Sequence, residues 1–306
     1  MSDGRNATSA GDLLTLDELR ALRRLSAWRG AGLVLHAWLV IAATMVLYAA
    51  WPSLVTLLVA VVVIGSRQLA LAVLMHEASH WLLFPGQRAN SRVGTWLCAA
   101  PIFADLPRYR RHHHLHHRHT QQPDDPDLAR AASYPVGRLA LVAAGLSDVA
   151  GITAGRLLLA WRPWRAGSTL SWRRLRGPLV ANAVLLGVLV ATGHGPLYLL
   201  LWILPLVTWY QLLVRLRDVA EHGVVPDGDD PLRNTRTTRA GRLARTLVAP
   251  YWVNHHLEHH VLVFVPCWRL ADAHALLLAK GHGPSMELAS GYPEVIRRAT
   301  TLERAR

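Results

Sequence analysis

Four long apolar stretches limit how this chain of 306 residues can fold. They cover approximately residues 32–51, 54–74, 178–192 and 197–216. A helix needs about 20 apolar residues to span the hydrocarbon core of a bilayer, and only the third stretch is clearly shorter than that. Since 52% of all residues are hydrophobic, the chain is too apolar for an ordinary soluble domain of this length. The pattern predicts an all-α integral membrane protein built on a four-span helical bundle.

Two weaker apolar stretches are expected to lie beside the bundle. Residues 93–104 are too few to span and predict a re-entrant or interfacial piece. Residues 139–161 are long enough, but Asp148, Arg156 and several glycines interrupt them. We expect an amphipathic helix at the membrane interface there, and a fifth span is the alternative.

The charges of the chain predict its orientation. The turns at residues 52–53 and 193–196 contain no lysine or arginine, whereas residues 108–176 and the segment before the first stretch are rich in arginine. The positive-inside rule therefore places both termini and the long loop in the cytoplasm. Lys280 is the only lysine in a chain of net charge +13. A composition so rich in arginine and alanine is typical of a GC-rich bacterial genome, so we expect a multi-pass protein of a bacterial inner membrane.

The same pattern divides the chain into three parts. Residues 1–31 are expected to form a cytoplasmic N-terminal segment, and residues 32–289 the membrane domain with its interfacial helices. Residues 290–306 are a polar C-terminal tail, which we expect to be peripheral.

Three tight histidine clusters lie on the predicted cytoplasmic side of the spans. Residues three or four positions apart share one face of a helix, so each cluster can present several imidazoles in one direction. Neutral imidazole is a common ligand of transition metals. The histidines with this spacing, cluster by cluster, are His76 and His80; His113, His116 and His117; and His256, His259 and His260.

A further histidine extends this candidate metal site. His222 lies just past the fourth apolar stretch, at the depth of His80, and is a candidate ninth ligand. Within the second cluster, His112 offers an alternative register with His116. His114 lies off the shared face and is not expected to be a ligand.

Polar residues near the clusters are candidates for holding the ligands in place. Metal-bound imidazoles commonly donate their second N–H to a carboxylate. Asp124, Asp125 and Asp127 follow the second cluster, and an acidic turn without a metal role is the alternative reading. The residues we select as supporting groups or alternative ligands are His112, Asp124, Asp127 and Asn254. Glu77 and Glu258, inside their clusters, are further candidates.

The number of histidines constrains the kind of metal site. One zinc ion usually takes four ligands, so eight or nine imidazoles indicate two sites of four or five ligands each. Imidazole suits iron, copper and zinc alike, so ligand type does not choose among them. Paired irons open to oxygen would explain a reaction at an apolar substrate.

These motifs resemble those of the membrane fatty acid desaturase and hydroxylase superfamily, over residues 32–268. Its pattern is H-x-x-x-H, H-x-x-H-H and H-x-x-H-H on the cytosolic side of four spans, often with an added histidine where His222 lies. The resemblance implies a histidine-rich cytoplasmic cap with a non-haem di-iron centre, two irons held by the histidines named above. It also implies oxygen-dependent oxidation of C–H bonds in a lipid, with two electrons supplied from outside. We expect fatty-acyl desaturation, with hydroxylation of an acyl, carotenoid or related lipid as the alternative.

The substrates and partners expected on this basis are a lipid in the membrane, O2 and a separate electron donor. The sequence has no His-Pro-Gly-Gly motif, no G-x-G-x-x-G motif and no pair of C-x-x-C motifs, so a ferredoxin and its reductase are expected to supply electrons. The arginines would attract an acidic ferredoxin, although topology and anionic lipid explain them equally well. No nucleic acid is expected, because a nucleic-acid site would explain the arginines but not the histidine spacing.

Two other function classes compete with this interpretation. His76, Glu77 and His80 read H-E-x-x-H, the motif of zinc proteases in which the glutamate acts as base. An intramembrane protease would leave the other two clusters unexplained. A metal transporter or sensor would carry ligands within its spans, where His36 is the main polar group. Metal analysis separates these classes, because two irons per chain favour the oxidase and one zinc without iron favours the protease.

Overall fold

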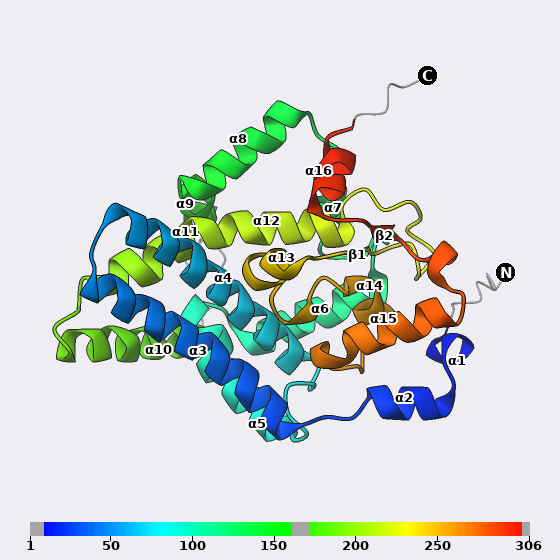
Figure 1. Ribbon diagram of the computed structural model, residues 1–306, viewed down its shortest axis with the longest axis horizontal. Coiled ribbons are helices and arrows are strands. Elements are labelled where there is room, and N and C mark those ends of the chain that lie inside the picture. Colours follow the sequence, from blue (N-terminus) through cyan, green and yellow to red (C-terminus); the bar gives the residue numbers. More distant parts are fainter. Residues whose placement is uncertain (1–8, 161–171, 302–306) are drawn as a thin grey trace.

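A computed structural model describes residues 9–160 and 172–301 (Figure 1). The described part is mostly helical, as predicted. It departs from an all-α fold in one short parallel pairing of β1 (Thr237–Thr238) with β2 (Leu288–Ala289). Residues 1–8 of the predicted N-terminal segment, residue 161 of the 139–161 stretch and residues 302–306 of the tail lie outside the described residues.

Three helices are long and apolar enough to cross a membrane. They are α3 (Ala27–Ala50), α4 (Leu54–Ser79) and the run Tyr198–His222. Ser26 and Ser53 begin the first two, because each hydroxyl accepts a backbone N–H of the first helical turn. Two thirds of the most apolar stretch of α4 is buried, against 22% for α3, so α4 is the central helix. The third run consists of η3 (Tyr198–Ile203), α11 (Leu204–Val207) and α12 (Trp209–His222).

The other apolar stretches do not form straight spans. The predicted third span corresponds to α10 (Trp172–Ala191), whose apolar part, Leu175–Ala191, falls short of a full crossing. The 139–161 stretch is not one interfacial helix but two, α8 (Arg138–Val149) and α9 (Ile152–Ala160), bent by 77°. The described residues therefore hold three candidate spans, or four if the bent pair is one span, and the predicted span count stays a prediction.

A buried carboxylate explains the bend between α8 and α9. Asp148 is fully buried and accepts hydrogen bonds from Arg215 of α12 (2.9 Å) and from the hydroxyl of Thr153 (2.6 Å). A buried charge is costly unless it is paired, so the end of α8 is held against α12. Gly151 follows with φ +75°, a conformation that favours glycine. The chain can therefore turn sharply at this point.

The predicted re-entrant piece is a short helical segment that packs against α4. It consists of α5 (Gln87–Val93), η1 (Gly94–Ala99) and η2 (Ala100–Ile102). A Cβ atom on Gly94 would lie 2.4 Å from Cβ of Ala78 and 3.0 Å from a methyl group of Leu106. The missing side chain therefore lets η1 fit between α4 and α6 (Leu106–His119), the helices that carry the first two histidine clusters.

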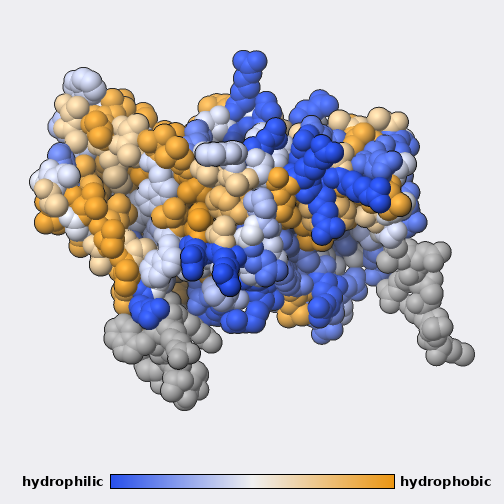
Figure 2. Space-filling model, turned by 90° about the horizontal axis from the view of Figure 1, so that it is seen from below, coloured by the Kyte–Doolittle hydropathy of each residue, from blue (hydrophilic) through white to orange (hydrophobic). Residues whose placement is uncertain are grey.

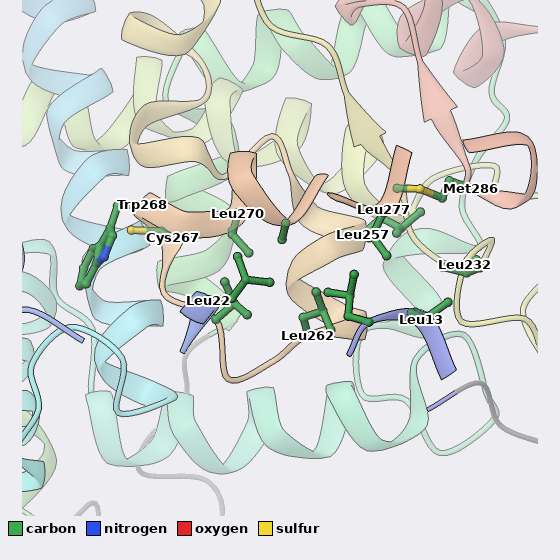
Figure 3. Packing of buried hydrophobic residues seen from close by; sticks show 13 residues of the cluster. Leu13, Leu22, Leu232, Leu257, Leu262, Cys267, Trp268, Leu270, Leu277 and Met286 are labelled. Atoms are coloured by element: carbon green, nitrogen blue, oxygen red, sulfur yellow. The ribbon is translucent and has the colours of Figure 1, made fainter. Parts of the chain in front are cut away.

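Short helices pack around a second hydrophobic core at the end of the molecule that carries the third histidine cluster. Leucines of α1 (Ala10–Leu13) and α2 (Leu16–Leu22) pack against α14 (His256–Val261) and α15 (Leu270–Ala279) (Figure 3). This packing holds α14, which carries the third cluster. The remaining short elements are α7 (Leu128–Ala131), α13 (Arg242–Leu247), η4 (Pro250–Trp252), η5 (Cys267–Arg269) and η6 (Gly283–Ser285).

The C-terminal tail contains a docked helix that its polar composition did not indicate. Val295 and Ala299 of α16 (Tyr292–Thr300) are buried in one cluster with Val219 and Ala220 of α12. They lie four residues apart and share one helical face. Figure 2 shows apolar surface over the end of the molecule that holds the α3–α4 turn and α10, and hydrophilic surface over the other end. That segregation fits a protein that is partly immersed in a membrane.

Candidate metal centre

The first histidine pair lies at the end of α4. The helix continues to Ser79, and His80 caps it, so His76 and His80 stand one turn apart with ring centroids separated by 5.0 Å. Trp81 then takes a left-handed conformation, with φ 64°, that no regular helix can continue. The helix therefore ends with both imidazoles at its terminal turn.

The second cluster lies on α6. Asp105 caps this helix by accepting the backbone N–H of Arg108 at 3.0 Å. His113 and His116 are buried and His117 is half-buried. The Nε2 atoms of His113 and His117 are 3.0 Å apart, as the four-residue spacing predicted.

The third cluster and His222 meet between two elements. His256 begins α14 and His222 ends α12, and their Nε2 atoms are 2.9 Å apart. His260 brings its Nε2 to 3.0 Å from that of His256. His259 faces the second cluster, with its Nε2 3.0 Å from that of His117.

The nine predicted histidines thus form two adjacent groups. In the five-histidine group, one nitrogen of each ring lies within 4.8 Å of the others. In the four-histidine group, three rings meet the same limit and His256 joins through its contacts with His222 and His260. The groups adjoin where the rings of His117 and His260 stack at 4.0 Å. The first group is His76, His80, His113, His117 and His259; the second is His116, His222, His256 and His260.

The orientation of the rings fits metal ions better than a hydrogen-bonded network. The Nε2 atom of His117 lies 3.0 Å from two other Nε2 atoms, and a neutral imidazole has only one N–H to donate. Both ring nitrogens of His76 and Nε2 of His80 are buried without a hydrogen-bond partner among the described residues. Two imidazoles bound at right angles to one ion, with bonds of about 2.1 Å, would place their nitrogens about 3.0 Å apart.

Burial keeps these imidazoles in the neutral form that binds metal. It lowers the pKa of His113, His259 and His260 well below 6.5, and the neighbouring imidazoles lower it further. Burial, followed by the effects of His114 and Arg110, lowers the pKa of His80 to about 3. Because a metal ligand must be deprotonated, the rings are ready to bind at neutral pH.

Comparison with known proteins identifies the family. Residues 49–287, more than half of the chain, match the fatty acid desaturase family. The chain belongs to this family. It is 26% identical over 274 residues to the dihydrorhizobitoxine desaturase of Bradyrhizobium elkanii, a match that covers 78% of this chain and 74% of that protein. The expected superfamily is therefore confirmed, and this desaturase-family chain is an oxidoreductase with apolar helices suited to a membrane.

In this desaturase-family chain three outward ring nitrogens of the four-histidine group lie near oxygen atoms, whereas Nδ1 of His222 and Nδ1 of His259 have no hydrogen-bond partner among the described residues. Nδ1 of His116 lies 2.8 Å from Oδ1 of Asp125, and Nδ1 of His260 lies 3.2 Å from the hydroxyl of Thr120. Nδ1 of His256 is 3.6 Å from a carboxylate oxygen of Glu221. Oxygen partners of this kind fix the tautomer and orientation of metal-bound histidines.

Asp125 is the best defined of these partners. Its side chain is 2% exposed. Burial alone would raise the pKa of Asp125, but the hydrogen bonds from His116 and from the amides of Asp127 and Gln121 lower it below its usual value. The carboxylate is therefore ionised and can hold the Nδ1 proton of His116.

Of the residues selected from the sequence as supporting groups, Asp127 lies beside His116 and the others lie outside the two histidine groups. Asp124 is exposed and makes no hydrogen bond with the described residues. One carboxylate oxygen of Asp127 lies 3.9 Å from Nδ1 of His116, and the other lies 3.2 Å from Nε2 of His112, which is outside both histidine groups. The amide of Asn254 donates to the carbonyl of Thr238 in β1. His114, which was not expected to be a ligand, lies outside both groups with Nε2 3.1 Å from the carbonyl of Ser79.

The sequence carried only partial signals for the partners it missed. Asp125 was one of three neighbouring aspartates, and the turn after α6, with φ 62° at Gln121, decides which of them faces His116. Glu221 directly precedes His222 and lies four residues after Arg217, which pairs with it at 2.7 Å. The four-residue spacing of Arg217 and Glu221, directly before a predicted ligand, was the available sequence signal for Glu221.

The position of Glu77 argues against a zinc protease. Its Oε2 accepts the backbone N–H of Cys267 at 2.8 Å, and its Oε1 lies 3.4 Å from Nδ1 of His76. The carboxylate therefore faces the segment after the third cluster, whereas a general base must reach the water it activates. His76 and His80 also share their group with three more histidines.

Two cavities adjoin the histidines. One of about 270 Å³ borders both groups, with an apolar wall from Leu69, Ala72 and Val214 and a charged rim that includes Arg130 and Asp218. The other, of about 510 Å³, reaches His80 and His117 and is lined by Trp81, Leu82, Val263 and Phe264 among others. The histidines are thus accessible from two sides.

Proposed function

We propose that this chain desaturates a fatty-acyl chain at two irons held by its nine clustered histidines. One observation carries the proposal: ring nitrogens converge in two adjacent groups of five and four histidines, while Nδ1 of His116 and Nδ1 of His260 lie within hydrogen-bond distance of oxygen atoms. Two neighbouring sites of neutral nitrogen ligands suit a pair of redox-active ions. Irons bound there would supply, with O2 and two external electrons, the oxidising power that an unactivated C–H bond requires.

The protein residues position the substrate and the ligands. The lining of the 270 Å³ cavity includes Leu69, Ala72 and Val214 as well as histidines of both groups, and methylene groups would be buried against these apolar side chains. Asp125 would hold the Nδ1 proton of His116, and Glu221 that of His256. No nearby group needs to act as acid or base on the substrate, because no side chain can deprotonate such a methylene.

The orientation follows from the charges. We infer that both termini and the metal centre face the cytoplasm of a bacterial inner membrane. The arginine-rich segments are predicted on the same side of the spans as the histidine clusters, and such segments face the cytoplasm. A separate donor such as a ferredoxin with its reductase would deliver electrons there.

The proposal of a lipid substrate has to be compared with the compound for which the similar desaturase is named. A desaturase that is 26% identical to this chain over the aligned residues is named for dihydrorhizobitoxine, so this compound is a necessary alternative substrate in any assay. We favour an acyl chain because apolar residues of the candidate spans, Leu69, Ala72 and Val214, lie in the lining of the cavity beside the histidines.

The test combines metal analysis with mass spectrometry. We expect the purified chain to contain two irons, and lipids of a host expressing it with an electron donor to lose two hydrogens per reaction. His259→Ala is expected to abolish the product. His114→Ala, on the same face of the membrane but outside both groups, is the control and should keep most of it.

Other results would refute the proposal. Lipids that gain an oxygen atom would indicate hydroxylation, and conversion of dihydrorhizobitoxine alone would refute the acyl substrate. One zinc without iron would refute the di-iron centre. Equal losses in His259→Ala and His114→Ala would contradict the ligand assignment.

A further inference from the structure

We propose that a hollow beside α13, separate from the metal centre, binds the phosphate of an anionic membrane phospholipid. The hollow has a volume of about 430 Å³ and is lined by Arg242, Arg245, Thr246, Tyr251 and Trp252. The proposal does not depend on which reaction the chain catalyses.

Two unpaired guanidinium groups define the chemistry of the hollow. Arg242 and Arg245 lie three residues apart on α13, so their side chains point to the same side of the helix. Both are exposed, and neither forms an ion pair with a carboxylate among the described residues. By contrast, the half-exposed Arg130 is paired with Asp218 at 3.3 Å. Two guanidinium groups side by side suit the oxygen atoms of a phosphate.

A third guanidinium lies behind the floor of the hollow. Arg67 of α4 is 4% exposed and donates to the carbonyl of Thr246, and no carboxylate pairs with it in the described part of the chain. The hydroxyl of Tyr251 donates to the carbonyl of Leu33 at 2.9 Å. The floor is therefore held to α3 and α4 and carries a positive charge that the described residues do not neutralise.

The hollow lies beside the half of α4 that leads to the first histidine pair. Arg67 lies seven residues before residue 74, where the apolar stretch of α4 ends, so its backbone lies about 10 Å inside that stretch. Long arginine side chains at such a depth extend toward the headgroups. Leu243 on α13 is 74% exposed. Interfacial helices insert such residues 5–10 Å into the boundary between headgroups and acyl chains, and Trp and Tyr concentrate at that boundary.

The exposed leucine and the charges together favour a phospholipid over other anions. Free phosphate in solution would not account for the exposed Leu243. An acidic protein would have to approach a surface that adjoins two membrane helices. A phospholipid satisfies both features, because its phosphate reaches the arginines while its acyl chains lie beside the leucine.

The site connects to the metal centre through one short segment. Tyr251 and Trp252 have φ values of 55° and 60°, a costly conformation for such large residues. They lie just before α14, which begins at His256. A lipid packed against both side chains would therefore favour the backbone conformation that leads into the third cluster.

Quenching of tryptophan fluorescence by brominated lipids tests the proposal on the full chain. The protein is reconstituted with brominated phosphatidylglycerol or brominated phosphatidylcholine, and the signal of Trp252 is the difference between wild type and Trp252→Phe. We expect phosphatidylglycerol to quench Trp252 at much lower content than phosphatidylcholine. A basic residue near an anionic surface contributes about fivefold in affinity. R242Q with R245Q should therefore weaken the preference roughly thirtyfold.

Matched variants separate this site from general charge effects. R233Q with R297Q removes two exposed arginines that form no ion pair in the described structure, and it should keep the preference. R242K with R245K should keep much of the preference, which shows that the Gln variant fails through charge and not through folding.

Equal quenching by both lipids, or an unchanged preference in the Gln variant, would overturn the proposal. Displacement of the lipid by millimolar inorganic phosphate would indicate a phosphate site instead. Protection of Trp252 by an acidic protein and by neither lipid would indicate a protein-docking site.

Discussion

Replacing Asp125 by Asn tests how the four-histidine group is held. The carboxylate of Asp125 accepts three hydrogen bonds of 2.8–2.9 Å, from Nδ1 of His116 and from the amides of Gln121 and Asp127. Asn has nearly the same shape but no charge, and its amino group must face one of these three donors. The substitution therefore removes a charge-assisted contact and creates one repulsive contact.

The size of the effect follows from the charge of the acceptor. A hydrogen bond to a charged group stabilises by about 1.5–3 kcal/mol, against about 0.5–1.5 kcal/mol for a neutral pair. The difference of about 1–1.5 kcal/mol corresponds to roughly tenfold in affinity. Supporting carboxylates of metal-bound histidines typically change metal affinity by about 10–100-fold. We expect Asp125→Asn to lose one of two metals at roughly tenfold lower chelator concentration than wild type.

Asp124→Asn is the matched control, because it makes the same chemical change one residue away on an exposed side chain. Metal retention is measured by chelator titration followed by elemental analysis, and thermal unfolding of the metal-free forms reports any general loss of stability. Wild-type retention in Asp125→Asn, or an equal loss in Asp124→Asn, would refute the role given to Asp125.

Three further predictions follow from the packing and the charges. The metal-free protein should lose stability as the pH falls from 7 to 5, because the clustered imidazoles stay neutral in the folded chain but take up protons below pH 6.5 in the unfolded chain. Thermal unfolding measures this change, and unchanged or rising stability would contradict the prediction. Gly94→Ala should destabilise the protein by about 1–3 kcal/mol through overpacking against Ala78, whereas Gly86→Ala, where nothing lies within 4 Å, should have little effect. Asp148→Asn should cost about 3 kcal/mol by breaking its buried pair with Arg215, and a wild-type unfolding temperature would refute the explanation of the bend.

The sequence indicated less about the shape of the membrane helices than about the residues of the candidate metal site. Composition identified apolar segments, but it did not indicate that residues 139–161 bend by 77°. That bend depends on the contact of Asp148 with Arg215, 67 residues away, and periodicity within one segment carries no information on such a partner. The docking of α16 was missed for a similar reason, since Val295 and Ala299 give too few apolar residues to predict burial.

For the candidate metal site, too, the sequence determined some features and the tertiary structure decided others. Spacing alone selected eight histidines, because residues three or four apart on a helix must share a face whatever surrounds it, and His222 was added from its position just past the fourth apolar stretch. The charge pattern grouped the three clusters on one side of the membrane for an equally local reason. Only the tertiary structure decided that His259 joins His76 while His260 joins His222, and that Asp125 rather than Asp124 faces His116. Those choices depend on the packing of helices distant in sequence and on one turn after α6, and neither is determined by the local order of residues.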